Sequence, residues 1–283
     1  MILKNTVYYN EAFLPQKGDI AVENEILAQV GGTQTGSGID LSGCTVVPGF
    51  IDIHTHGAMG GDTCDAREES LAGMSRFLAN HGVTSFCPTT MTLPFEQLAE
   101  SLRIARDYRG HECGAYIQGI NMEGPFISEA KKGAQNGAYL HAPDAAMFRR
   151  VQEKAGGLFK LCDMAPELPG AMETIEELSG EVRISLAHTE ADYDIACEAF
   201  RRGARQATHL FNAMPPFSHR APGVIGAAFD SENVTVELIA DGVHIHPSVV
   251  RAVFTLFDGR VILISDSMMA TGLADGEYSL GGQ

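Results

Sequence analysis

The sequence has few positive charges and no long apolar run, and both absences exclude classes of partner. Its 283 residues include 20 lysines and arginines against 36 aspartates and glutamates, a formal net charge of −16. A surface this acidic disfavours nonspecific binding to nucleic acid or to anionic membranes. No stretch offers the roughly 18 consecutive apolar residues of a membrane span, and the N-terminus lacks the basic start and apolar run of a signal peptide. We therefore expect a cytoplasmic protein that binds neither nucleic acid nor a membrane. An anionic substrate would need a local positive pocket.

The sequence also lacks paired cysteines and nucleotide-binding loops. None of its six cysteines forms a C-x-x-C pair, and they lie tens of residues apart within apolar stretches. This usage is typical of buried thiols in a reducing compartment. No G-x-G-x-x-G or Walker sequence opens a helix, which argues against a nucleotide-binding fold. The cysteines are Cys44, Cys64, Cys87, Cys113, Cys162 and Cys197.

The length fits one large barrel with an appendage, or two domains. Residues 1–45 contain three short β-prone runs, at 6–9, 19–22 and 26–30, separated by turn signals. They predict a small antiparallel sheet domain. From residue 46 onward, short apolar runs bounded by glycine or proline alternate with segments of helical periodicity, which assigns 46–283 to a second domain.

The second domain contains eight β-like runs. Eight alternating βα units predict a parallel (β/α)8 barrel of the TIM type. A doubly wound open sheet is the alternative, weakened by the missing nucleotide loops. Among the helices, we expect one to end at Gly82 and another to begin at Thr189, with Asp192 completing a capping-box-like start. The β-like runs lie at 46–53, 83–87, 114–122, 158–164, 183–187, 206–208, 234–240 and 261–265.

Imidazoles and carboxylates recur where these runs end. In such a barrel the C-terminal strand ends carry the chemistry. In His54-Thr55-His56 both rings point to one side of a strand, because side chains alternate with period two. Imidazoles with a carboxylate suit Zn²⁺ or Fe²⁺ and leave a position for water, whose pKa the ion lowers. Asp266 would then transfer the proton of that water. The residues at predicted strand ends are His54, His56, Glu123, His188, His209, Asp241, His244 and Asp266.

The alternative for any one of these histidines is a satisfied core or surface residue, and several together make coincidence a poor explanation. Other histidines fall in predicted helix ends or loops, and we interpret them as structural or surface residues. They are His81, His111, His141 and His219.

Six motifs follow one another along the chain. They are PGFIDIHTHG at 48–57, NMEGPFI at 121–127, KKGA at 131–134, THLFNAM at 208–214, DGVH at 241–244 and ISDSM at 264–268. The first resembles the entry motif of the amidohydrolase superfamily, and the others resemble, in order, the N-acetylglucosamine-6-phosphate deacetylase family within it. The resemblance implies metal-dependent hydrolysis of the acetamide of N-acetylglucosamine 6-phosphate, which gives glucosamine 6-phosphate and acetate.

The resemblance also implies roles for the residues at the strand ends. Glu123, His188 and His209 match the ligands of the main metal. His54 and His56 match the ligands of a second metal that only some members hold, so one or two divalent ions, zinc or iron, are expected, with Glu123 as a bridge. Asp266 matches the catalytic acid and base.

Further matches concern the substrate. Asn212 and the backbone of Ala213 match groups near the sugar phosphate, and His244 matches a substrate-binding histidine. Arg220 matches an arginine that reaches the phosphate in the neighbouring subunit, which implies a homodimer; a guanidinium fork suits phosphate. Gln135 stands where the family often has a histidine that holds the acyl carbonyl, and glutamine can donate a hydrogen bond there but carries no charge.

The chain also departs from the family at its end, because family members continue well past the eighth strand. We therefore expect the small sheet to lack partner strands and the barrel to lack its last helix. Two alternatives stay open: another amidohydrolase, such as a deacetylase of a different amino-sugar phosphate, and an inactive fragment.

Overall fold

The computed structural model describes residues 1–281, and its chain divides into two compact units, Met1–Gly49 and Phe50–Gln283. The sequence pattern assigns residue 46 to the barrel, but Val46 pairs with Tyr8 in the sheet of the first unit. The first barrel strand begins only at Phe50. Pro48 and Gly49, which cannot continue a regular strand easily, separate the two.

The first unit is a five-stranded sheet of mixed direction. Its order is β3-β2-β1-β4, with β5 also pairing with β1. The two longer pairings are antiparallel, as the sequence predicts, whereas β4 and β5 run parallel to β1. The strands are β1 (Ile2–Tyr9), β2 (Pro15–Glu23), β3 (Ile26–Val30), β4 (Ile39–Asp40) and β5 (Thr45–Val46).

The second unit is built on a nine-stranded parallel sheet. Its order is β6-β9-β11-β12-β13-β14-β15-β16, and β10 also pairs with β9. Because β10 and β11 pair with successive parts of β9, they occupy one strand position, and the nine strands fill eight positions of a barrel. The strands are β6 (Phe50–Thr55), β9 (Val83–Thr90), β10 (Tyr116–Ile117), β11 (Ile120–Met122), β12 (Phe159–Met164), β13 (Arg183–Leu186), β14 (Gln206–Ala207), β15 (Thr235–Ile239) and β16 (Val261–Ile264). A short hairpin, β7 (Gly57–Ala58) and β8 (Gly61–Asp62), follows β6.

Hydrogen bonds just after β16, the last strand of the barrel, connect it to β6, the first. The amide of Asp266 donates to the carbonyl of His54 at 2.9 Å, and the amide of His56 donates to the carbonyl of Ser267 at 2.8 Å. Below them, the hydroxyl of Ser265 donates to the carboxylate of Asp52. The sheet therefore forms a nearly closed barrel, which confirms the predicted (β/α)8 architecture over the open alternative. This seam also sets Asp266 beside the two histidines of β6.

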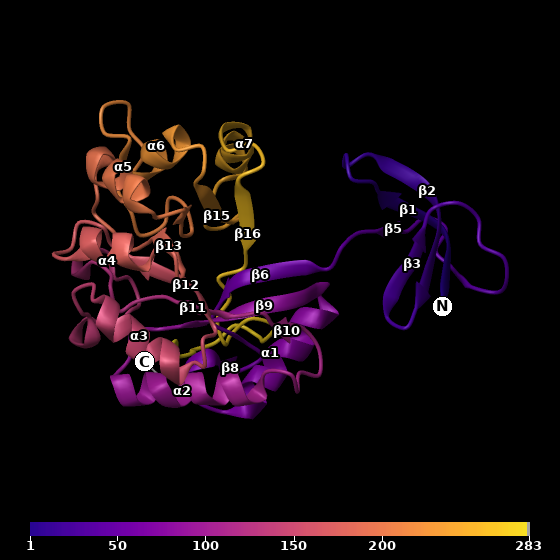
Figure 1. Cartoon of the computed structure of the whole chain (residues 1–283), viewed down its shortest axis with the longest axis horizontal. Coiled ribbons are helices and arrows are strands. Elements are labelled where there is room, and N and C mark those ends of the chain that lie inside the picture. The colour runs from indigo at the N-terminus through magenta and orange to yellow at the C-terminus, as the bar shows by residue number, and fades with distance from the viewer. Residues whose placement is uncertain (282–283) are drawn as a thin grey trace. The chain divides into compact units, whose positions relative to one another are not determined.

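Helices lie along the outer side of most strands of this unit (Figure 1). The left-handed Gly82 (φ 83°) follows α1, as expected for a helix stop. The expected start at Thr189 is wrong: α5 begins at Tyr193, and Asp192 itself accepts from the amide of Ile195 as the N-cap. The helices are α1 (Glu68–Asn80), α2 (Phe95–Tyr108), α3 (Ala145–Lys154), α4 (Ala171–Leu178), α5 (Tyr193–Arg202), α6 (Gly223–Asp230) and α7 (Pro247–Leu256), with 3₁₀ turns η1 (Thr63–Asp65), η2 (Glu129–Lys131) and η3 (Gly137–Tyr139).

All six cysteines are free thiols, but not all of them are buried. Cys44 and Cys113 are exposed and Cys197 is half-buried, so the expectation that all six are buried is wrong.

None of the described helices combines the length and the apolar character needed to cross a membrane.

Candidate metal centre

Six chemistry-bearing side chains meet at one end of the barrel. His54 lies at the end of β6, and the others follow β6, β11, β13, β14 and β16. Because the carboxyl ends of parallel strands share one end of a barrel, residues far apart in the chain come together there. The structure brings together His54, His56, Glu123, His188, His209 and Asp266.

Glu123 lies between two imidazoles on one side. Its Oε1 lies 3.0 Å from Nε2 of His188 and 3.3 Å from Nε2 of His209. The same two ring nitrogens are 3.2 Å apart. Two nitrogen atoms and a carboxylate oxygen that converge so closely can share one cation, and this donor set suits zinc or iron.

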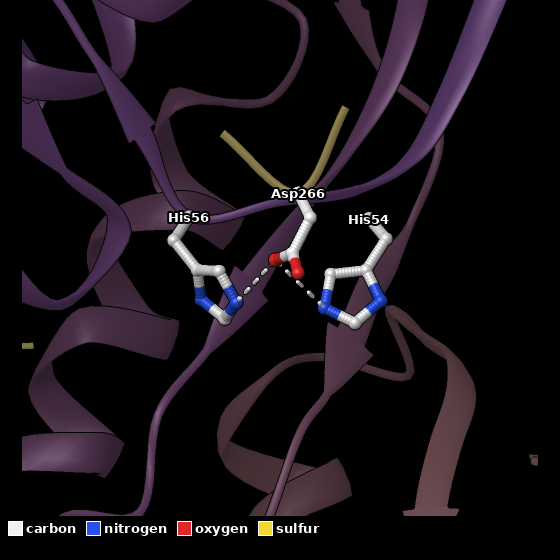
Figure 2. A group of neighbouring side chains, drawn as sticks. All are labelled: His54, His56 and Asp266. Atoms are coloured by element: carbon white, nitrogen blue, oxygen red, sulfur yellow. Dashed lines mark ion pairs between the residues drawn. The ribbon is translucent and has the colours of Figure 1, made fainter. Parts of the chain in front are cut away.

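A second group faces the other side of Glu123. Figure 2 shows His54 and His56 pointing at the Asp266 carboxylate, with Nε2–Oδ1 distances of 3.6 and 3.4 Å. Glu123 reaches both of these rings as well, with Oε1 3.5 Å from His54 and Oε2 3.3 Å from His56. Its two oxygens therefore lie between two groups of possible ligands, as a bridging carboxylate requires.

A buried nitrogen with no hydrogen-bond partner tests whether a cation fits this second group. His54 is fully buried, and its Nδ1 contacts Glu237, but its Nε2 makes no hydrogen bond within the described residues. A buried polar atom without a partner costs free energy. A divalent ion bound by this lone pair would remove the cost, so the residues fit a metal.

The electrostatics of the site also favour a cation. Burial by itself would lower the pKa of His56, but the carboxylates of Asp266 and Glu123 raise it to about 10. Burial would raise the pKa of Glu123, yet His188, His209 and His54 hold it well below its ordinary value. The carboxylates therefore concentrate negative charge at this end of the barrel, and any proton on a ligand ring is displaced when a divalent ion binds.

Three of these residues have a left-handed backbone. The φ angles are 43° at His188, 27° at His209 and 47° at Asp266. Residues with a Cβ rarely adopt this region, and such strain clusters at functional sites. The strand-to-loop turns here hold the side chains toward the barrel mouth at a cost in backbone energy.

A cavity of about 270 Å³ opens beside the two groups. Four residues predicted to bind substrate line it, and the fifth, Arg220, does not. The side chain of Arg220 is exposed on the loop before α6. The predicted substrate residues in the lining are Gln135, Asn212, Ala213 and His244.

Gln135 contacts the carboxylate at the centre of the site. It is buried, its Oε1 accepts from the amide of Thr92, and its Nε2 donates to Oε2 of Glu123, both at 2.6 Å. The glutamine therefore orients the carboxylate oxygen that faces His56. The resemblance implies a contact with the acyl carbonyl at this position, and the structure adds this contact with Glu123.

His244 lies at the exposed rim of the cavity. Its Nδ1 lies 2.8 Å from Oδ2 of Asp241, whose other oxygen accepts from the amides of Val243 and His244. The hydrogen bond from the His244 ring and those from the backbone lower the pKa of Asp241 to about 2. The ring is thereby fixed, with Nε2 available to a ligand.

The sequence reasoning missed two buried carboxylates beneath the site. Glu237 on β15 contacts His54, and Asp163 on β12 accepts from the hydroxyl of Thr208 at 2.9 Å. Both are fully buried. The only signal in the sequence was an acidic residue within an apolar strand, as in the run V-T-V-E-L-I at 234–239.

Comparison with known proteins agrees with this geometry. The family model described as "Amidohydrolase family" matches residues 45–275. The chain belongs to the amidohydrolase family. It is 43% identical over 244 residues to N-acetylglucosamine-6-phosphate deacetylase of Bacillus subtilis, which covers 84% of this chain and 62% of that protein. It is 36% identical to the enzyme of the same name from Lysinibacillus sphaericus, over 100% of this chain and 75% of that one.

Solved structures of this kind also match the chain. The crystal structure of the Mycobacterium smegmatis N-acetyl-D-glucosamine-6-phosphate deacetylase has a TM-score of 0.91 at 33% identity, covering 99% of this chain and 75% of that one. An aspartate-to-alanine variant of that enzyme, in complex with N-acetyl-D-glucosamine-6-phosphate, has a TM-score of 0.92. The motif-based resemblance is confirmed. The chain spans less than two thirds of the length of the Bacillus subtilis relative.

Proposed function

We propose that the protein is a metal-dependent deacetylase that hydrolyses the acetamide of N-acetylglucosamine 6-phosphate to glucosamine 6-phosphate and acetate. The observation that carries the proposal is the position of Glu123, whose two oxygens lie within 3.5 Å of four imidazoles beside a cavity. The relatives named for this reaction support the choice of substrate.

The residues of the site fit the steps of amide hydrolysis. A bound divalent ion would polarise the acetamide carbonyl and lower the pKa of water. Asp266 is suited to accept the proton of the attacking water because its carboxylate lines the cavity beside His54 and His56. These two histidines hold its pKa below the ordinary value against the effect of burial, so the carboxylate is ionised before the reaction. As the carbon–nitrogen bond breaks, Asp266 delivers that proton to the departing amine nitrogen. His244 and Asn212, in the cavity lining, would orient the sugar.

The proposal includes the cofactor, the assembly and the compartment. The nitrogen-rich donor set favours zinc or iron, with one ion at Glu123, His188 and His209 and a second at His54 and His56. Arg220 would reach the phosphate in a neighbouring subunit of a homodimer, which agrees with its exposed position outside the cavity lining. Six free thiols agree with a reducing cytoplasm.

An acetate-release assay tests the reaction. The metal-loaded protein should release acetate from N-acetylglucosamine 6-phosphate, and chelation followed by readdition of zinc or iron should abolish and restore the rate. Unphosphorylated N-acetylglucosamine should be a far poorer substrate. Acetate release that is insensitive to chelation, or no release by a folded, metal-loaded protein, would contradict the proposal.

Replacing Arg220 with alanine should raise KM for the phosphorylated sugar. A lost charge-assisted hydrogen bond of about 1.5–3 kcal/mol corresponds to roughly a tenfold to hundredfold increase. kcat should change little, since Arg220 lies away from the reacting bond. The matched control is Arg251→Ala, which removes another exposed arginine, on α7. An unchanged KM in steady-state kinetics would favour an amidohydrolase with a different substrate.

A further inference from the structure

We propose that Glu237 is a positioning residue that orients His54 and thereby sets the affinity of the protein for its second metal ion. The inference rests on the proposed two-ion site and assigns part of its affinity to a residue outside the ligand set. Among the described residues, Glu237 is not a member of any group that could hold a metal ion.

The contact between the two side chains is direct and fully buried. Oε2 of Glu237 lies 3.0 Å from Nδ1 of His54, and neither side chain is exposed to solvent. A carboxylate at Nδ1 holds the ring proton on that nitrogen. It therefore leaves Nε2, which faces Glu123 and Asp266, as the atom with a free lone pair. Such carboxylates fix the ring orientation of metal-bound histidines and raise their basicity.

Glu237 is itself held from both sides. Nε2 of Gln206, on the adjacent strand β14, donates to its Oε1 at 2.6 Å, and the backbone amide of His209 approaches Oε2 at 3.3 Å. The amide of Leu210 also donates to the backbone carbonyl of Glu237. The carboxylate cannot turn without breaking these contacts. It is therefore a rigid support for His54 and connects β15 to the loop that carries His209.

The position of Glu237 points to a role beyond packing. Within residues 1–281, its only ion-pair partner is the His54 ring. A buried carboxylate is costly unless it is paired. A cation held at Nε2 of His54 would strengthen this contact through the ring. Glutamine has nearly the same size as glutamate, so Glu237→Gln separates the support of His54 from packing.

The test is metal titration of the metal-free protein by calorimetry, with zinc as the probe. The native protein should bind two ions. Glu237→Gln, which keeps the size of the side chain, should weaken one of them by about 10- to 100-fold, as loss of such supporting carboxylates does. The other ion should bind as before. Gln206→Met, which removes the donor to Glu237, should weaken the same ion by a smaller factor and is an independent variant if the first does not fold.

Two controls separate positioning from general loosening of the barrel. Ser185→Ala removes a buried hydroxyl that contacts Thr208 but no imidazole, and it should leave both affinities unchanged. In a His56→Ala background, where the second ion is already lost, Glu237→Gln should have no further effect on the remaining ion. The metal-free Tm of each variant is measured alongside.

The outcomes are distinct. Native affinity for both ions in Glu237→Gln overturns the inference and leaves the proposed function intact. Equal weakening of both ions, matched by Ser185→Ala, assigns Glu237 a structural role and also overturns it. A native protein that binds no more than one ion overturns the two-ion site and the inference with it.

Discussion

Asp266→Asn should lower kcat by about 10²- to 10⁴-fold, the usual contribution of a positioned acid or base. Asparagine has nearly the shape of aspartate but cannot accept the proton of the attacking water. The ion at Glu123, His188 and His209 should stay bound, because Asp266 belongs to the other group of ligands. Acetate release and metal content, measured on the same sample, check both parts.

The control for this variant is Asp258→Asn, which makes the same chemical change at an exposed position after α7. It should leave kcat unchanged. Near-native turnover in Asp266→Asn would refute the role of Asp266 in proton transfer. A variant that loses turnover together with all of its metal would instead make Asp266 chiefly a ligand.

Glu123→Gln should remove bound metal and bring acetate release close to the limit of detection. Among residues 1–281, Glu123 is the one side chain within 3.5 Å of all four imidazoles, so its charge holds both groups together. Without the ion, the pKa of water stays near 16 instead of falling to about 7, and attack on the amide is correspondingly slow. Elemental analysis of the purified variant measures the loss.

Glu153→Gln is the matched control, since it neutralises an exposed glutamate near the end of α3. It should keep native metal content and activity. Two ions per chain in Glu123→Gln would contradict the bridging role. Loss of one ion only would restrict Glu123 to a single group.

The sequence predicts the barrel and the convergence of the site for a simple reason. Most strands of the barrel are marked by an apolar run, and their C-terminal ends lie at one end of the barrel. The sequence alone could therefore place His54 and Asp266 together, although they are 212 positions apart in the chain. No periodicity marks two-residue strands such as β4 and β5, so their parallel pairing was out of reach.

Other features depend on contacts that no local pattern encodes. Glu237 alternates with apolar neighbours on β15, but which residue its carboxylate would meet depends on the curvature of the whole barrel. Thr189 and Asp192 both suit a helix N-cap, and Thr189 instead donates to the carboxylate of Glu167. Local propensity could not choose between them.

Diffraction from crystals of the zinc-loaded protein, collected on both sides of the zinc absorption edge, tests the central claim most directly. An anomalous peak should lie at about 2.0–2.2 Å from Glu123 and from the Nε2 atoms of His188 and His209, with a second peak beside His54 and His56. Zinc bound elsewhere, with these side chains free of metal, would contradict the account.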